Sequence, residues 1–200
     1  PILEEMGYFI DPGLVSQVRG MPTGMKLAIG GAIATSKDAK STFYLDPQRG
    51  IVAINASDMN QVLSDFDTLE QKIQETLSVN LGKSAQFYEF ILDAEAKVQP
   101  PRDPSRETGN LWRGSPTLMK MSDVLGWSVT QFGLRLVQEG SLTTDTKWAE
   151  FRIEPSITKP QSHYMINVVY REPQKAGVMA EARRARNRID SMLNVLAEAS

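Results

Sequence analysis

Residues 175–200 read KAGVMAEARRARNRIDSMLNVLAEAS. Apolar side chains recur in this segment at alternating spacings of four and three residues, at Val178, Ala182, Ala185, Ile189, Met192 and Leu196. That spacing places them along one side of an α-helix, because a helix turns once in about 3.6 residues. The segment therefore predicts one long amphipathic helix that lies on a hydrophobic core.

Three segments with alternating apolar residues come before this helix, and alternation is typical of β-strands. They are residues 127–138, 147–153 and 163–171. The same order occurs earlier in the chain, with strand-like segments at residues 26–35, 41–45 and 51–55 and a helix-like segment at residues 57–79. Helices that follow runs of strands predict an α+β fold, in which long amphipathic helices cover one face of antiparallel sheets.

Each of these two passes also begins with a strand-like segment and a short helix-like segment. The pattern predicts a β-α-β-β-β-α unit that is used twice. The first half would span residues 1–98 and the second half residues 117–200, with a Pro- and Arg-rich linker or loop at residues 99–116. One compact domain that contains both halves is the alternative.

This element order resembles the duplicated fold of TATA-binding proteins. Pro12-Gly13-Leu14-Val15 resembles a Pro-Gly-Leu-Val/Ile segment of that family. The resemblance implies two halves joined edge to edge into a curved sheet with the helices outside. It does not extend to function, because the paired phenylalanines that wedge into DNA in that family have no clear match in this chain, and fold analogy alone does not establish function.

The composition excludes several classes of site. The chain has no cysteine, so it has no disulfide, no thiolate nucleophile and no Cys-ligated zinc or iron–sulfur centre. No apolar run reaches the ~20 residues that span a bilayer, so no membrane partner is expected. No signal peptide is visible, and a cytoplasmic location is the default expectation.

Recognisable catalytic motifs are missing as well. His163 is the single histidine, no Gly-x-Ser-x-Gly elbow occurs, and neither a dinucleotide glycine fingerprint nor a His-rich metal motif is present. The sequence therefore predicts no cofactor and no metal site. A non-enzymatic binding protein is favoured, and a small-ligand enzyme or carrier with a site between the two halves is the alternative.

One candidate binding surface is the helix-free face of the second predicted sheet. Its members are Gln131, Arg135, Trp148, Glu150, Arg152, Glu154, His163, Asn167 and Arg171. Arginines beside an aromatic ring and amide groups suit an anionic or planar ligand, or a protein partner. The alternative is a solvated face with cross-strand Arg–Glu pairs.

A candidate interface lies on the strand predicted at residues 26–35, where one face carries only the small residues Ala28, Gly30, Ala32 and Ala34. Such a face predicts close packing against the other half or against a second copy, and a ligand on bare backbone is the alternative. In the loop, Trp112 and Arg113 are either an anchor or a contact for a partner. A short helix at residues 117–125 is predicted to face inward with Leu118, Met121, Val124 and Leu125.

Charge is distributed unevenly along the chain. Residues 1–100 carry 13 acidic and 8 basic side chains, whereas residues 101–200 carry 11 acidic and 14 basic ones. The arginines of the last helix, Arg183, Arg184, Arg186 and Arg188, could contact phosphates, although a solvated helix face is favoured over nucleic-acid binding. The sequence as a whole predicts a binding or scaffolding protein that self-associates or binds a protein partner.

Overall fold

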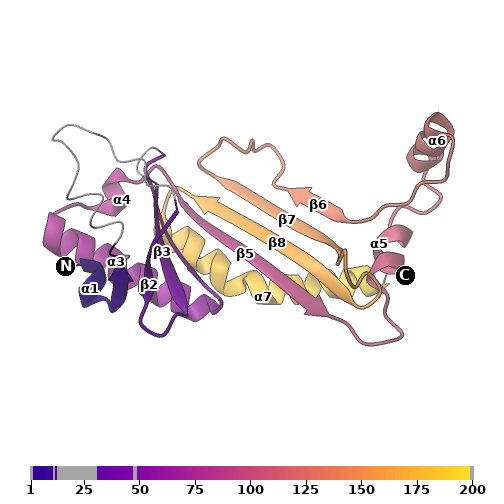
Figure 1. The fold of residues 1–200 in the computed structure, drawn as a ribbon. Helices are drawn as coiled ribbons and strands as arrows, with labels where there is room; N and C mark the ends of the chain where they lie inside the picture. Colours follow the sequence, from indigo (N-terminus) through magenta and orange to yellow (C-terminus); the bar gives the residue numbers. More distant parts are fainter. Residues whose placement is uncertain (1, 11, 13–30, 47–48, 199–200) are drawn as a thin grey trace. The chain divides into compact units, whose positions relative to one another are not determined.

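The computed structural model describes residues 2–10, 12, 31–46 and 49–198. The chain divides into two compact units, Pro1–Ser84 and Ala85–Ser200. Among the described residues, each unit contains one four-stranded antiparallel sheet (Figure 1). These sheets, together with long helices, confirm the α+β class with antiparallel sheets.

The first unit is a meander of strands followed by one long helix. Its elements are α1 (Ile2–Glu5), β1 (Tyr8–Ile10), β2 (Gly31–Ser36), β3 (Ser41–Asp46), β4 (Ile51–Ala56), α3 (Met59–Leu77) and α4 (Leu81–Ser84). The strands follow the order β1-β2-β3-β4, so each strand pairs with its neighbour in sequence. Its core cluster contains Tyr8, Ala34, Phe43 and Leu69, which join three strands to α3.

Local chemistry sets the limits of α3. The side chain of Asp58 accepts a hydrogen bond from the backbone nitrogen of Gln61, which satisfies one of the free donors at the helix start. Ser78 ends the helix in the left-handed conformation, with φ 55°. Helix α3 therefore begins and ends within two residues of the predicted segment 57–79.

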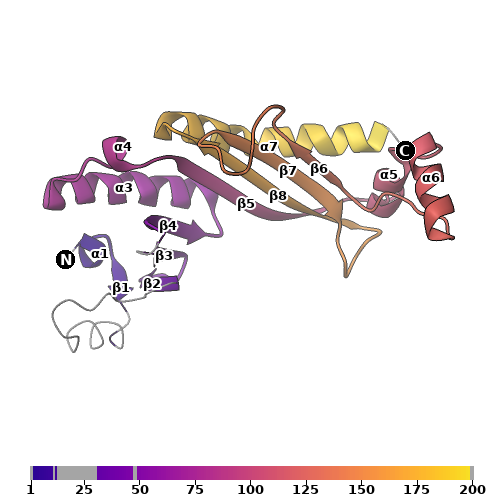
Figure 2. The ribbon, with the colours of Figure 1, turned by 90° about the horizontal axis from the view of Figure 1, so that it is seen from above.

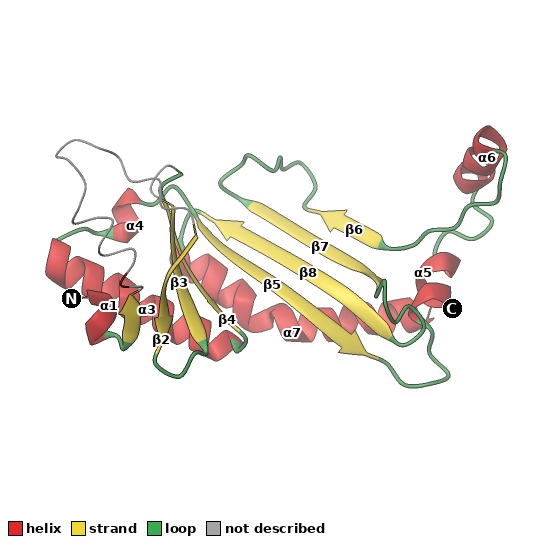
Figure 3. Cartoon of the chain, in the orientation of Figure 1, coloured by secondary structure: helices red, strands yellow, loops and turns green. Residues whose placement is uncertain are grey.

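The second unit places its first strand beside its last one. Its elements are β5 (Tyr88–Lys97), α5 (Pro104–Asn110), α6 (Pro116–Leu125), β6 (Leu134–Val137), β7 (Trp148–Pro155), β8 (His163–Glu172) and α7 (Lys175–Glu198). The strand order is β5-β8-β7-β6 (Figure 3). Strand β5 runs antiparallel to β8 over its whole length, from the pair Tyr88–Glu172 to the pair Lys97–His163.

Helix α7 lies along one face of this sheet (Figure 2). Its buried residues are Val178, Met179, Ala182, Ala185, Ile189, Leu193 and Leu196. The facing side of β8 buries Tyr164, Ile166, Val168 and Tyr170. The predicted helix and its apolar side are thus present, although Leu193 is more deeply buried than the predicted Met192.

The division between the units differs from the predicted boundary at residue 98. Strand β5 belongs to the second sheet because it pairs with β8, so the division falls between Ser84 and Ala85. The predicted linker at residues 99–116 also belongs to the second unit. It contains α5, whose residues Pro104, Glu107 and Thr108 are buried.

The two sheets differ in topology, although their elements follow a similar order along the chain. In the first sheet the first strand pairs with the second strand, whereas in the second sheet it pairs with the last strand. A duplicated unit would place its first strand beside the same neighbour twice, so the topology does not support duplication. Of the segment Pro12–Val15, only Pro12 lies within the described residues.

Candidate functional site

The outer face of the second sheet brings most of the predicted binding residues together. Register places Trp148 beside Arg171, and Arg152 beside both Asn167 and Arg135. The sheet also brings in residues of β5 that the prediction did not include, because Glu89 pairs with Arg171 and Asp93 with Asn167. Acidic side chains therefore line the same surface as the arginines.

Every arginine of this face forms an ion pair with a carboxylate. Arg135 binds Glu150 at 2.7 Å, Arg152 binds Glu154 at 2.9 Å and Arg171 binds Glu89 at 2.6 Å. Arg171 also donates to the carbonyl oxygens of Thr143 and Asp145 in the loop between β6 and β7. This geometry is that of a solvated face with paired charges, which was the alternative to a binding surface. The guanidinium groups of the three arginines already donate to acceptors within the chain.

The other predicted members of this face are similarly occupied. Trp148 is only 6% exposed, so its ring offers little surface to a ligand. The amide of Asn167 donates to Asp93 at 2.8 Å, and Nδ1 of His163 shares a 2.7 Å hydrogen bond with the hydroxyl of Ser162. Gln131 lies before β6, and its Nε2 donates to the carbonyl of Gly133 at 2.7 Å.

The small-residue face is described only in part. Ala28 and Gly30 lie outside the described residues, and so does the side chain of Ala32. Ala34 is buried and belongs to the core cluster with Phe43 and Leu69 of the same unit. At this position, then, the chain itself supplies the packing partner.

The segment that joins β5 to β6 forms a different kind of site, built on α5 and α6. Asp103 caps α5 by accepting hydrogen bonds from the backbone nitrogens of Ser105 and Arg106. The hydroxyl of Ser115 caps α6 by accepting from Leu118, and Gly126 ends α6 with φ 75°. These caps fix two short helices on either side of the turn that carries Trp112 and Arg113.

A pocket of about 410 Å³ lies within this segment. Its charged lining residues are Arg106 and Arg113, and its apolar lining residues are Leu118, Met119 and Val129. Hydroxyl and amide side chains complete the wall, from Ser105, Asn110, Ser122, Ser128 and Thr130. Arg113 was predicted from the sequence as a contact residue, but Arg106, seven positions earlier in the same arginine- and proline-rich segment, was not.

Close backbone approach holds the pocket together. The hydroxyl of Thr130 donates to the carbonyl of Gly109 at 3.3 Å, and a Cβ atom on Gly109 would come within 2.9 Å of that hydroxyl oxygen. The hydroxyl of Ser122 accepts from the nitrogen of Val129 at 3.1 Å. The residues before β6 are therefore fixed against both α5 and α6.

Helix α6 buries none of its residues, contrary to the predicted inward side. Met121, Val124 and Leu125 are all exposed, and Val124 is 85% exposed. Trp112 and Trp127, which flank the helix, are exposed as well. Figures 1 and 2 both draw α6 beyond α5 at one end of the second unit, away from the sheet. The apolar residues of α6 are spaced as in a packed helix. Three of them, Met121, Val124 and Leu125, form an apolar ridge that no described part of the chain covers.

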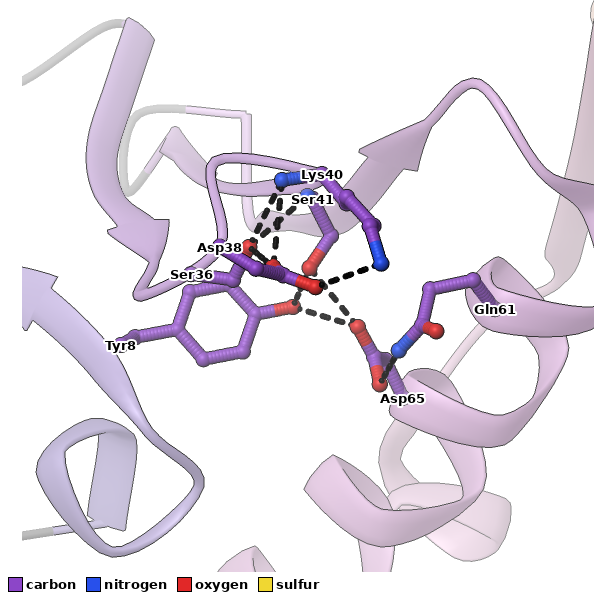
Figure 4. A network of polar contacts seen from close by, with 7 residues as sticks. All are labelled: Tyr8, Ser36, Asp38, Lys40, Ser41, Gln61 and Asp65. Atoms are coloured by element: carbon purple, nitrogen blue, oxygen red, sulfur yellow. Dashed lines mark hydrogen bonds and ion pairs between the residues drawn. The ribbon is translucent and has the colours of Figure 1, made fainter.

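A buried polar network in the first unit was a further candidate (Figure 4). The hydroxyls of Tyr8 and Ser41 both donate to Oδ2 of Asp65 at 2.8 Å, and Gln61 binds the other carboxylate oxygen. Burial, followed by the contact with Asp65, raises the pKa of Tyr8 to about 12. Because Tyr8 and Ser41 are buried and both hydroxyls donate to Asp65, this cluster fastens α3 to the sheet and offers no group to a substrate.

Two other kinds of feature are missing from the described parts of the chain. No three His, Asp or Glu side chains there lie close enough together to hold a metal ion. None of the described helices has both the length and the apolar character that crossing a bilayer requires.

Comparison with other proteins does not assign a function. No protein-family model matches the chain, and no curated protein and no solved structure is significantly similar to it. A function for this chain can therefore be inferred only from its own residues.

Proposed function

We propose that this chain is a non-enzymatic binding protein that self-associates through helix α6. The observation that carries the proposal is the apolar ridge of α6, formed by Met121, Val124 and Leu125, which has no cover within the described chain. Exposed apolar patches of this kind are typical of protein–protein contact sites.

Exposed apolar area near the ridge favours a contact of this kind. Trp112 and Trp127 flank α6 in sequence, and each is more than half exposed. Two tryptophans can bury roughly 300–500 Å² when fully exposed, so about half of that area is left here, and a standard interface buries about 800 Å² per partner. Together with the three ridge residues, the tryptophans supply part of one side of such an interface.

A second copy of the chain fits this ridge. Spacings of three and four residues place Met121, Val124 and Leu125 side by side on the helix, and none of them is charged. In a two-fold symmetric contact the same patch meets itself, so an uncharged ridge avoids like-charge repulsion. Two α6 helices that pack in this way would cover both ridges at once.

Sedimentation velocity of the full chain over a concentration series tests the proposal. Wild-type protein should form a dimer, and Val124→Asp should weaken the dimer by about tenfold or more, because two carboxylates would be desolvated close together. Ile157→Asp is the matched control, since Ile157 is 82% exposed but lies in a loop distant in sequence from α6. A chain that stays monomeric at all concentrations, or equal effects of the two substitutions, would overturn self-association through α6.

A further inference from the structure

We propose that the pocket between α5 and α6 binds a small organic anion of the phosphate-monoester class, with Arg106 and Arg113 as its cationic ligands. This inference goes beyond self-association, because it rests on the pocket lining and not on the ridge of Met121, Val124 and Leu125.

The charge of the pocket is the first argument. Arg106 and Arg113 line it, whereas none of its lining residues is acidic. The carboxylate of Asp103 is occupied at the start of α5, where it accepts from backbone nitrogens, and it forms no ion pair with Arg106. Two formal positive charges are therefore uncompensated in one concave site.

Most other arginines of the second unit differ from Arg106 and Arg113, because they have a carboxylate partner. Arg102, Arg135, Arg152, Arg171, Arg184 and Arg188 are each paired with a carboxylate. Within the described residues, neither Arg106 nor Arg113 has an ion pair or a side-chain hydrogen bond. Arg183 and Arg186 are likewise unpaired there and all four side chains are exposed, but Arg183 and Arg186 line no pocket.

Hydrogen-bond donors in the pocket can be divided into occupied and free ones. The hydroxyls of Ser105, Ser122 and Thr130 already donate to the carbonyls of Pro160, Leu118 and Gly109. In the described structure, the amide of Asn110 and the hydroxyl of Ser128 form no hydrogen bond. These two groups and the two guanidinium groups give four side chains with free donors, which suits the several acceptor oxygens of a phosphate group.

Pocket size and the apolar wall indicate what the anion carries. A volume of about 410 Å³ falls within the range of small-molecule sites and exceeds the volume of a bare phosphate ion. Leu118, Met119 and Val129 supply an apolar part of the lining, in contrast to the two charged arginines. A phosphate attached to a compact organic body, as in phenyl phosphate, would use both the donors and this wall.

Calorimetric titration of the full chain with phenyl phosphate, inorganic phosphate and benzoate tests the proposal. Phenyl phosphate should bind more tightly than inorganic phosphate, which lacks the organic body, and more tightly than benzoate, which carries one charge. The double variant Arg106→Gln/Arg113→Gln should bind phenyl phosphate at least about tenfold more weakly, because it loses charge-assisted hydrogen bonds.

The matched control is Arg183→Gln/Arg186→Gln, which removes the same charge from exposed positions outside the pocket. It should bind phenyl phosphate within about twofold of the wild type. Equal weakening in both double variants would show that only general charge attracts the anion, and it would overturn the proposal. So would tighter binding of benzoate, or the lack of saturable binding by the wild type.

Nuclear magnetic resonance locates the binding. Backbone amide signals of Gly109 and Gly114, which line the pocket, should shift on addition of phenyl phosphate. The amide of Gly140, in the turn after β6, should not shift. The variant Val124→Asp should bind phenyl phosphate as the wild type does, because Val124 does not line the pocket, so failure of self-association and failure of anion binding can be told apart.

Discussion

The hydroxyl of Tyr164 donates a 2.6 Å hydrogen bond to Oε2 of Glu107, and both side chains are buried. Arg102 binds the same carboxylate through Nε at 2.9 Å and Nη2 at 2.7 Å, and it also donates to the carbonyl of Leu193 at 2.7 Å. This network joins α5 to β8 and α7. The helix that begins the pocket segment is therefore anchored to the core, while α6 at its far end is exposed.

Loss of the arginine should destabilise the second unit. Arg102→Ala would leave the carboxylate of Glu107, which is 2% exposed, without its charged partner. We expect a loss of roughly 3 kcal/mol in the free energy of unfolding, at the low end for a buried pair because Arg102 itself is partly exposed. Urea unfolding followed by tryptophan fluorescence measures it, since all three tryptophans, including the buried Trp148, belong to this unit.

Arg135→Ala is the control for this experiment. Arg135 also binds a glutamate through two nitrogens, with Nε 2.7 Å and Nη2 3.0 Å from Glu150, but on the solvated face of the sheet. Exposed pairs contribute about 0–1 kcal/mol, so this variant should remain close to the wild type. Similar losses in Arg102→Ala and Arg135→Ala would contradict the structural role given to the Glu107 network.

The same network predicts a dependence of stability on acid pH. Burial raises the pKa of Glu107, but the hydrogen bonds from Arg102 and Tyr164 outweigh it, and the pKa lies below its usual value of 4.5. Because the folded-state pKa is lowered, the stabilisation is present above pH 4.5 and is lost as the pH falls through the folded-state value. The advantage of wild type over Glu107→Gln in unfolding free energy should therefore shrink between neutral pH and pH values below 4.5. Parallel curves for the two proteins would show that Glu107 does not titrate in this way.

In the first unit, the hydroxyl of Tyr8 should contribute to stability. Tyr8→Phe removes one of the two hydroxyl donors to Oδ2 of Asp65, and the cost of a lost buried hydrogen bond is about 1–3 kcal/mol. The first unit contains no tryptophan, so amide hydrogen exchange in β1 and β3 is the suitable measurement. Tyr44→Phe on β3 is the control and should change the free energy by less than about 0.5 kcal/mol, because the Tyr44 hydroxyl forms no hydrogen bond with any residue that the structure describes. Equal changes would mean that the Tyr8 hydroxyl adds nothing specific.

Much of the fold could be predicted from periodicity. The spacing of Val178, Ala182, Ala185 and Ile189 predicted α7 and its buried side, and the alternation of residues 163–171 predicted β8. Periodicity describes one segment at a time, however, and cannot show which strands become neighbours. For that reason the predicted boundary at residue 98 placed β5 in the first half, whereas its pairing with β8 places it in the second unit.

The candidate sites were harder to predict for the same reason. The apolar spacing of Met121, Val124 and Leu125 is the same whether a helix is covered or exposed, so the inward side of α6 was predicted wrongly. The arginines of the sheet face lie on the neighbouring strands β6, β7 and β8, but their acidic partners come partly from β5. Arg106 and Arg113 share a pocket only because the caps and the turn between α5 and α6 fold the segment back.

The end of α7 provides a last test of the packing in the second unit. Leu196 is 1% exposed, whereas its neighbour Val195 is 55% exposed, because adjacent side chains of a helix point about 100° apart and only Leu196 faces the core. Leu196→Ala should lower the free energy of unfolding by about 2–5 kcal/mol, because it removes buried methyl groups and leaves a cavity. Val195→Ala should change it by less than about 0.5 kcal/mol, because an exposed valine loses no core contact and alanine is the better helix former. Urea unfolding followed by tryptophan fluorescence compares the two variants, and equally small effects would show that the last turns of α7 are not packed on the core.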